Sequence, residues 1–328
     1  MSSYDAAWML KTPDDHGALM KRLVIDTDPG VDDAEAIMMA SVHPDANIEA
    51  VTVVSGNVPL EHTTANACKI LDVMGEEAAV YAGCPGPLVS RPDEDAAFVH
   101  GEDGLGDAGL AASTRKVEEE HAANALVRMA NDHPGELSLV AIGPLTNIAL
   151  ATRLDPGMPQ KYKELILMGG AIYAQGNTVN TTAEFNIFFD PEAAYVVFDA
   201  WPELTMVSWE ATMSHPIGSE KLARLQNNNN PRGQFFDAIS AQVLKYISEV
   251  MKRDVLLAAD PLAMAVALEP DIVTRAAKHH VHVERMGGAS RGQTIVDWND
   301  RAGKPPNANI VLDVDEERFF DLFHAAVR

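Results

Sequence analysis

The sequence is poor in cysteine and in basic residues, and both shortages exclude classes of protein. Its 328 residues contain two cysteines, Cys68 and Cys84. Two cysteines cannot form a disulfide framework and are typical of a reducing compartment. Asp and Glu number 48 against 25 Lys and Arg, which gives a formal net charge of −23. Because such a charge repels polyanions and anionic lipid surfaces, we expect neither nucleic acid nor a membrane as a partner.

Long hydrophobic runs are also missing from the sequence. No stretch approaches the roughly 18 apolar residues of a membrane-spanning helix, and residues 1–22 contain no apolar segment of the signal-peptide type. We therefore expect a cytoplasmic protein. Hydrophobic residues nevertheless make up 47% of the chain, and charged residues only 22%. That balance is sufficient for a large buried core.

Short β-branched apolar runs alternate with amphipathic helical patterns along the first two thirds of the chain. The apolar runs predict buried strands at 21–26, 46–55, 78–83, 136–143 and 164–170. The patterns between them predict helices at 32–44, 59–75, 118–134 and 144–154. Strand–helix alternation with short connections indicates one α/β domain whose mostly parallel sheet is covered on both faces. Residues 85–118 have no strong periodicity and predict a long loop, a feature that is usually functional or disordered.

Four aspartates crowd the stretch LVIDTDPGVDDAEAI, directly after the first predicted strand: Asp26, Asp28, Asp32 and Asp33. Three chemistries would gather carboxylates there. They are a divalent-cation site, an aspartyl nucleophile for phosphoryl transfer, and simple capping of the next helix by the last two aspartates. In open α/β sheets ligands bind at the carboxyl ends of the strands, where these residues are predicted to lie.

Two of the competing interpretations are weak. A phosphatase would need a downstream Ser or Thr, a Lys and a second acidic pair, and the chain offers no convincing set. The twelfth position of an EF-hand loop counted from Asp26 is Ile37, where a carboxylate is required. A cation site at the strand end is favoured, with Asp260 in AADPLAM as a ligand from a late helix.

The motifs DTDPGVDDAEAI, SGN, HGEDGLGD, GPLTNIALA, AEFNIFFDPEAA and DPLAMA, in this order, resemble the inosine–uridine nucleoside hydrolase family. The resemblance implies one α/β domain, residues 22–328, with a Rossmann-like, mostly parallel central sheet flanked by helices, after an N-terminal extension at 1–21. It also implies one bound Ca²⁺ and hydrolysis of the N-glycosidic bond of ribonucleosides. It further implies a homodimer or homotetramer. The ligand types alone would admit Mg²⁺ as well as Ca²⁺.

The resemblance assigns the acidic residues to two tasks. Asp28, Asp33 and Asp260 would bind Ca²⁺ together with the backbone carbonyl of Thr146. Asp28 would also be the general base, since a bound cation acidifies its water and a neighbouring carboxylate can accept the proton. Asp26 would support the turn. The ribose would be held by Asp32, Asn57, Met168, Asn177, Glu184 and Asn186.

Two of these assignments keep an alternative. The family places an asparagine after a glycine, six residues before the glutamate, whereas QGNTVNTTAEFN places Asn177 seven residues before Glu184. Asn177 is assigned because it keeps the Gly-Asn pair, and Asn180 is the alternative. Met168 closes a predicted strand and would border the ribose, but it also fits an ordinary core methionine.

The sequence departs from the family on the side of the site that would face the base. Many members carry a histidine before the late aspartate, and this histidine protonates the departing base. This chain has Ala259, which can neither donate a proton nor stack. We expect His100 in VHGEDG to act as a relocated acid and Trp209 to offer an aromatic face. Two further neighbours of the base are considered, Tyr246 and His215.

The missing histidine leaves two other functions open. A hydrolase of another ribosyl compound, such as a modified nucleoside or nicotinamide riboside, would manage without the acid because a cationic base departs unprotonated. A non-catalytic, Ca²⁺-dependent ribose-binding protein would need only the sugar contacts. Asp28 argues against the binding protein, since sugar binding alone requires no water-activating carboxylate. Hydrolysis of ribonucleosides is therefore the leading hypothesis.

Overall fold

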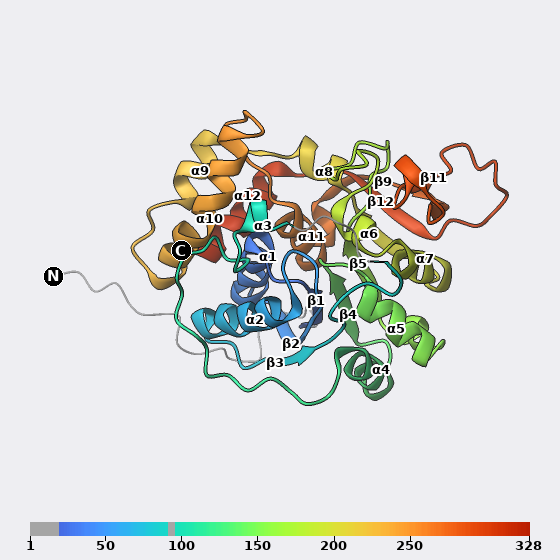
Figure 1. Ribbon diagram of the computed structural model, residues 1–328, viewed down its shortest axis with the longest axis horizontal. Coiled ribbons are helices and arrows are strands. Elements are labelled where there is room, and N and C mark those ends of the chain that lie inside the picture. The colour runs from blue at the N-terminus through green and yellow to red at the C-terminus, as the bar shows by residue number, and fades with distance from the viewer. Residues whose placement is uncertain (1–19, 91–95) are drawn as a thin grey trace.

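The centre of the molecule is an eight-stranded sheet in the order β3-β2-β1-β4-β5-β6-β12-β9 (Figure 1). The structure is a computed structural model that describes residues 20–90 and 96–328. Every neighbouring pair is parallel except β9, which lies antiparallel to β12 at one edge. The strands are β1 Lys21–Thr27, β2 Ala46–Val53, β3 Ala79–Ala82, β4 Leu137–Ala141, β5 Glu164–Met168, β6 Leu204–Val207, β9 Val273–His279 and β12 Ala308–Val314.

Helices cover both faces of this sheet and build a separate core on each (Figure 1). One face carries α1 Val31–Val42, α2 Leu60–Met74, α10 Pro231–Glu249, α11 Ala259–Leu268 and α12 Glu316–Val327. The other carries α4 Ala122–Asp132, α5 Thr146–Leu154 and α7 Pro191–Ala200. The predicted fold is therefore confirmed: one α/β domain with a mostly parallel central sheet flanked by helices.

Shorter elements complete the chain around the sheet. Two small two-stranded antiparallel sheets pair β7 Ile217–Gly218 with β8 Val255–Leu256, and β10 Val281–Val283 with β11 Thr294–Val296. The region predicted as a long loop contains one helical turn, α3 Ala97–His100, in its described part. Further short helices are α6 Phe185–Phe189, α8 Trp209–Ser214, α9 Ser219–Leu225, η1 Met158–Gln160, η2 Pro270–Ile272 and η3 Gly288–Ser290.

The predicted N-terminal extension at 1–21 lies outside the described residues except for its last two. The strand β1 begins at Lys21, within one residue of the expected domain start. In the ranges that the structure describes, no helix combines the length and the apolarity needed to cross a bilayer.

Burial explains why the inner elements have nearly uniform apolar sequences. All five residues of β4 are buried because helices cover both of its faces. All ten residues of α11 are buried, since this helix packs against α1 on one side and against β4 and β5 on another. A helix enclosed on all sides loses the amphipathic stripe of a surface helix. This packing carries the first turn of α11 into the middle of the molecule.

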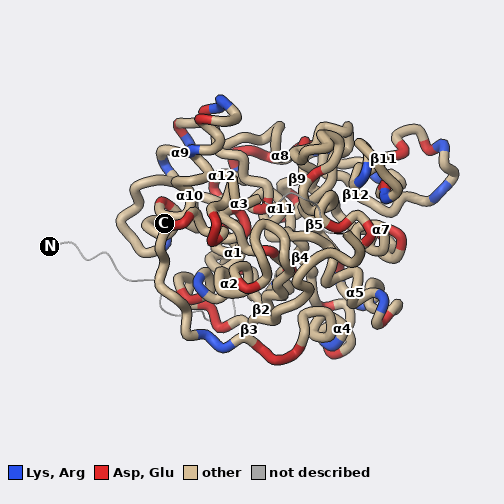
Figure 2. The backbone as a smooth tube through the Cα atoms, viewed as in Figure 1, with Lys and Arg blue, Asp and Glu red and all other residues tan. Residues whose placement is uncertain are grey.

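The order of the strands creates one topological switch point. From β1 the chain proceeds outward to β2 and β3, and then returns to place β4 on the other side of β1. In sheets of this kind the crevice outside the carboxyl ends of the strands, at the switch point, is where ligands bind. The carboxyl end of β1 leads directly into Asp28. Figure 2 shows acidic segments near this centre, at α1 and α11, whereas the basic segments lie mainly at the periphery.

Candidate active site

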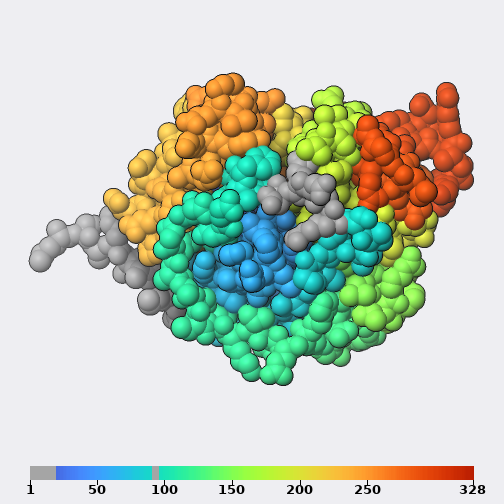
Figure 3. Space-filling view, in the orientation of Figure 1, coloured from blue at the N-terminus to red at the C-terminus, as the bar shows by residue number. Residues whose placement is uncertain are grey.

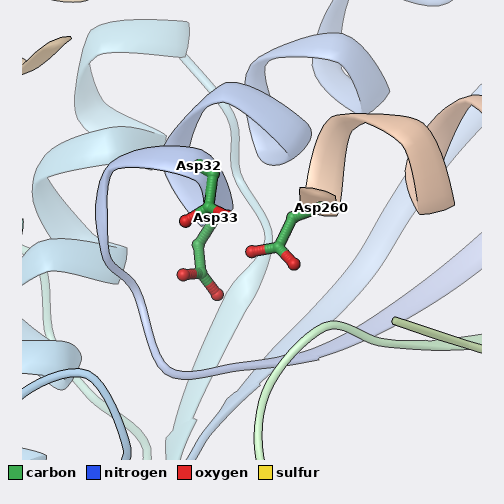
Figure 4. A group of neighbouring side chains, drawn as sticks. All are labelled: Asp32, Asp33 and Asp260. Atoms are coloured by element: carbon green, nitrogen blue, oxygen red, sulfur yellow. The ribbon is translucent and has the colours of Figure 1, made fainter. Parts of the chain in front are cut away.

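Three carboxylates from two helices converge beyond the end of β1. Asp32 and Asp33 lie in the first turn of α1, and Asp260 lies in the first turn of α11. Each offers an oxygen within 4.8 Å of the others (Figure 4). The prediction had grouped Asp28, rather than Asp32, with the other two as ligands. In the structure Asp28 adjoins this cluster, and its charge raises the pKa of Asp260.

The Asp28 carboxylate occupies a narrow slot between the ends of β2 and β4. The Asn57 backbone N–H donates to its Oδ2 at 2.7 Å. Its Oδ1 is buried and has no hydrogen-bond partner in the described residues. A Cβ atom at Gly56 would lie 2.0 Å from Oδ2, and one at Gly143 would lie 2.6 Å from Oδ1. The glycines of SGN and IGP are therefore required by the close approach of this carboxylate.

Asp33 is fixed by donors on three segments. The Gly30 N–H donates to its Oδ2 at 2.9 Å, and the Thr27 hydroxyl donates to its Oδ1. The Asn57 side chain donates to the same Oδ2 at 3.1 Å and to the Asp28 carbonyl at 3.2 Å. The bond from Gly30 is a cap at the start of α1, where the helix dipole favours negative charge. Helix capping and cation binding were alternative interpretations of these aspartates from the sequence. Asp33 can therefore serve both purposes.

The four carboxyl groups carry a large electrostatic cost. Burial raises the pKa of Asp32 and Asp33 to about 6, and the charge of Asp32 adds to the effect on Asp33. Burial first, and neighbouring charges second, raise the pKa of Asp28 and Asp260 well above the usual range. No Lys or Arg in the described residues forms an ion pair with any of the four. His100 Nδ1 lies 3.9 Å from Asp32, which would be an ion pair only if the ring were protonated. Hard oxygen donors without a counter-charge fit a divalent cation.

A cavity of about 350 Å³ opens beside the acidic cluster. Segments far apart in the sequence meet around it, and Figure 3 shows three of them on one face: the blue N-terminal part, the cyan-green segment that follows it, and orange α10. Three predicted site residues are outside its lining and are almost fully buried: Asp28, Asp33 and Thr146. The other nine line it: Asp32, Asn57, His100, Met168, Asn177, Glu184, Asn186, Trp209 and Asp260.

Glu184 and Asn186 hold the ends of β4 and β5 together. Glu184 caps α6, its carboxylate accepting from the backbone N–H groups of Asn186 at 2.8 Å and Gly170 at 2.9 Å. Burial raises the pKa of Glu184 to about 7 despite these bonds. The Asn186 amide donates to the carbonyls of Ile142 and Met168, both at 3.2 Å. Both side chains are thus held in one orientation at the cavity wall. No sequence signal indicated this capping role, because Glu is not among the residues preferred at a helix N-cap.

The structure separates the two candidate asparagines of the QGNTVN segment. Asn177 lines the cavity, and its Oδ1 accepts from the Phe185 N–H at 2.9 Å. The amide of Asn180 is occupied elsewhere, by the Thr178 hydroxyl and by the Arg291 carbonyl. The geometry therefore favours Asn177. Met168 is 3% exposed, as a core methionine would be, and it also lines the cavity. Its contact with the ribose stays a prediction.

Thr146 is held by an acidic residue beneath the site. Its hydroxyl donates to Asp190 Oδ2 at 2.7 Å. Asp190 also caps α7 through the Ala193 N–H at 3.0 Å and accepts from the Leu88 N–H at 2.8 Å. These bonds fix the start of α5. The Thr146 carbonyl as a cation ligand stays a prediction.

The part of the cavity next to Ala259 is mostly apolar. Two aromatic residues predicted for this side, Trp209 and Tyr246, do line it. His215 does not, because its ring is bound to Asp313 at 2.9 Å and to the Ala211 carbonyl at 2.8 Å. The expectation that His215 lies near the base is therefore wrong. The apolar lining comprises Phe98, Val99, Met213, Val243, Ile247, Met251, Leu256 and Leu257.

His100 lies in the cavity wall with one ring nitrogen already in use. The Val31 N–H, at the start of α1, donates to Nδ1 at 3.1 Å. Burial lowers the pKa of His100 to about 4, and the positive end of the helix dipole acts in the same direction. The ring is therefore neutral at physiological pH and carries its proton on Nε2.

Glu35 is a cavity residue that the sequence analysis did not identify. It lies on α1, is 1% exposed and lines the cavity. In the motif DDAEAI it resembles an ordinary helix residue. The sequence feature that could have revealed Glu35 is its position three residues after Asp32, because this spacing places both carboxylates on one face of the helix.

Comparison with known proteins identifies the family of the chain. The family model described as inosine-uridine preferring nucleoside hydrolase matches residues 23–321. The chain belongs to this nucleoside hydrolase family. The resemblance predicted from the motifs is therefore confirmed.

Relatives with different base preferences are about equally similar to the chain. The pyrimidine-specific ribonucleoside hydrolase RihB of Escherichia coli strain K12 is 33% identical over 312 residues, covering 94% of this chain and 97% of the relative. An inosine-guanosine nucleoside hydrolase structure is 33% identical with a TM-score of 0.88, and the plant nucleoside hydrolase PpNRh1 is 34% identical with a TM-score of 0.87. Both structural matches cover 94% of this chain and 99% of the other.

Proposed function

We propose that this protein cleaves the N-glycosidic bond of ribonucleosides with water and releases ribose and the free base. The observation that carries this proposal is a group of four aspartates beside the cavity, of which Asp28, Asp33 and Asp260 are buried and Asp32 is partly exposed. One oxygen of Asp28 has no hydrogen-bond partner among the described residues. A bound divalent cation, which we propose to be Ca²⁺, would neutralise these carboxylates and make a water molecule more acidic. Asp28, Asp33, Asp260 and the carbonyl of Thr146 would hold the cation.

Asp28 acts as the general base. Its Oδ2 is held by the Asn57 N–H, while Oδ1 has no partner in the part of the chain that the structure describes and can accept a proton from the attacking water. The slot between Gly56 and Gly143 prevents the carboxylate from turning away. General base catalysis by a positioned carboxylate contributes roughly 10²–10⁴-fold to a rate.

The polar side of the cavity binds the ribose. Carboxylate and amide side chains suit adjacent hydroxyl groups, each of which donates and accepts. Losing one such partner leaves a buried polar group unpaired, at a cost of about 1–3 kcal/mol. These contacts also stabilise the oxocarbenium-like transition state of glycosidic cleavage. The residues are Asp32, Asn57, Met168, Asn177, Glu184 and Asn186.

His100 donates a hydrogen bond to the departing base, and Trp209 offers it an aromatic face. Because the His100 ring is neutral, it serves as a hydrogen-bond donor through Nε2 rather than as a cationic acid.

We expect His100→Ala to lower kcat/KM for ordinary nucleosides by about 10–100-fold. Wild-type activity should show no histidine titration near pH 6.5, because the pKa of His100 is lowered to about 4. Initial rates from pH 5 to 8 check this, and a wild-type ionisation near pH 6.5 that is absent from the variant would contradict it.

The two competing functions, a hydrolase of another ribosyl compound and a ribose-binding protein, are not favoured by the comparisons. The relatives are hydrolases of ribonucleosides by name, rather than binding proteins or enzymes of other ribosyl compounds.

We further propose that the protein is a homodimer or homotetramer in the cytoplasm. Two free, buried cysteines are compatible with a reducing compartment.

The experiment that tests the function is a reducing-sugar assay with calcium over inosine, guanosine, adenosine, uridine, cytidine and nicotinamide riboside. We expect ribose release from at least one ordinary nucleoside by the wild type and none above background from Asp28→Ala. Release from nicotinamide riboside alone would favour the other ribosyl substrate. Tight ribose binding without release from any of them would favour the binding protein.

The slot around Asp28 allows a separate test that changes no polar group. In Gly143→Ala the new Cβ would lie 2.6 Å from Asp28 Oδ1 and 2.9 Å from the Asp28 nitrogen. We expect kcat to fall about 100-fold or more because the carboxylate must shift from its productive position. Gly86→Ala is the matched control, since its Cβ would meet nothing within 4 Å. Steady-state kinetics decide, and equal turnover of the two variants would contradict the proposed geometry.

A further inference from the structure

One acidic side chain of the cavity is unused by the proposed mechanism. Glu35 lines the cavity and is 1% exposed. In the described residues its carboxyl group has one hydrogen-bond partner, the Ser240 hydroxyl of α10, which donates to Oε1 at 3.2 Å. A carboxyl group offers about four lone-pair positions. Most of its hydrogen-bonding capacity is therefore available to a molecule in the cavity.

The surroundings of Glu35 place it on the base side of the cavity. Val243 and Ile247 follow Ser240 by three and seven residues, so they share one face of α10, and both line the cavity. This apolar face meets α1 where Ser240 binds Glu35. Asp32 and Asp33, proposed for the ribose and the cation, lie in the first turn of α1, whereas Glu35 is one residue beyond that turn. A buried carboxyl group beside apolar side chains is costly unless it pairs with a polar group.

We propose that Glu35 determines base specificity by accepting a hydrogen bond from an N–H donor on the edge of the base away from the sugar. This inference rests on the proposed nucleoside hydrolysis. Such donors are N1–H of hypoxanthine and guanine and N3–H of uracil, and a carboxyl oxygen accepts from them in either protonation state. Relatives named for pyrimidine nucleosides and for inosine and guanosine are both 33% identical to this chain, so overall similarity does not select the base. Residues of the base side, such as Glu35, must do so.

The test compares nucleosides that differ in this donor alone: inosine with 1-methylinosine, and uridine with 3-methyluridine. For at least one pair we expect the wild-type kcat/KM to favour the unmethylated nucleoside about tenfold or more. Glu35→Leu, which removes the acceptor at similar volume, should bring that ratio within about threefold of unity. Glu35→Gln keeps an acceptor oxygen and should retain most of the preference. The matched control is Glu61→Gln, whose side chain is 82% exposed on α2 and which should leave the ratio unchanged.

The outcomes separate this inference from the proposed function. A 4-nitrophenyl ribofuranoside, whose leaving group has no N–H, reports ribose-side chemistry alone. If the wild type cleaves neither nucleosides nor this aryl riboside, the proposed function fails. If it cleaves nucleosides but accepts both methylated forms equally, or if Glu35→Leu keeps the wild-type ratio, Glu35 is not the specificity residue. Should Glu35→Leu fail to fold by circular dichroism, Glu35→Ala, which also removes the acceptor, makes the same comparison, and an unchanged ratio would again overturn the inference.

Discussion

Asp28→Asn is expected to lower kcat by about a thousandfold, while the KM for the nucleoside changes far less. Asparagine has nearly the same shape and can still accept from the Asn57 N–H. The amide of the asparagine cannot accept a proton from water. It also places either an NH₂ donor or an uncharged oxygen at the position of Asp28 Oδ1. Steady-state kinetics with saturating calcium provide the measurement.

Asp199→Asn is the control for this substitution, because Asp199 is an exposed aspartate on α7. It should leave turnover unchanged. If Asp28→Asn retains both turnover and bound calcium, the general base and the ligand have been assigned to the wrong residue.

Asp260→Ala is expected to abolish the stabilisation of the protein by calcium. Wild-type protein should melt at a higher temperature with calcium than with a chelator, because a ligand at about 100 times its Kd stabilises the folded state by roughly 2.7 kcal/mol. Removing Asp260 deletes the contribution of α11 to the acidic cluster and should remove most of this shift. Without calcium the variant should be no less stable than the wild type, since the buried Asp260 and its repulsion with three neighbouring carboxylates are gone.

Calorimetric melting of both proteins, each with calcium, magnesium and chelator, checks this result. Nucleoside hydrolysis by Asp260→Ala should fall about 100-fold or more at a calcium concentration that saturates the wild type, and recover in part at higher calcium. The same thermal shift in variant and wild type would show that the cation is held elsewhere. A larger shift with magnesium than with calcium would instead correct the identity of the ion.

The sequence by itself determined the main course of the chain and the residue types of the site. Alternating apolar runs and helical patterns predict β1–β5 and the helices between them, because hydrophobic periodicity is a local property. The conformation of residues 28–33 is also predicted by a local pattern, because a Pro-Gly turn there joins a buried strand to the start of a helix. The motifs in order were enough to predict the family and therefore most of the polar residues that line the cavity.

Only the tertiary structure decided which of these residues meet and in what chemical state. Asp260 reaches Asp33 because α11 is buried between α1 and the sheet, a long-range packing that no local pattern encodes. Burial also sets protonation, as the neutral His100 ring shows, and desolvation depends on neighbours distant in sequence. His215 was misplaced and Glu35 was overlooked for the same reason. A side chain on a predicted helix faces a cavity or a neighbour according to how the helices pack around the sheet.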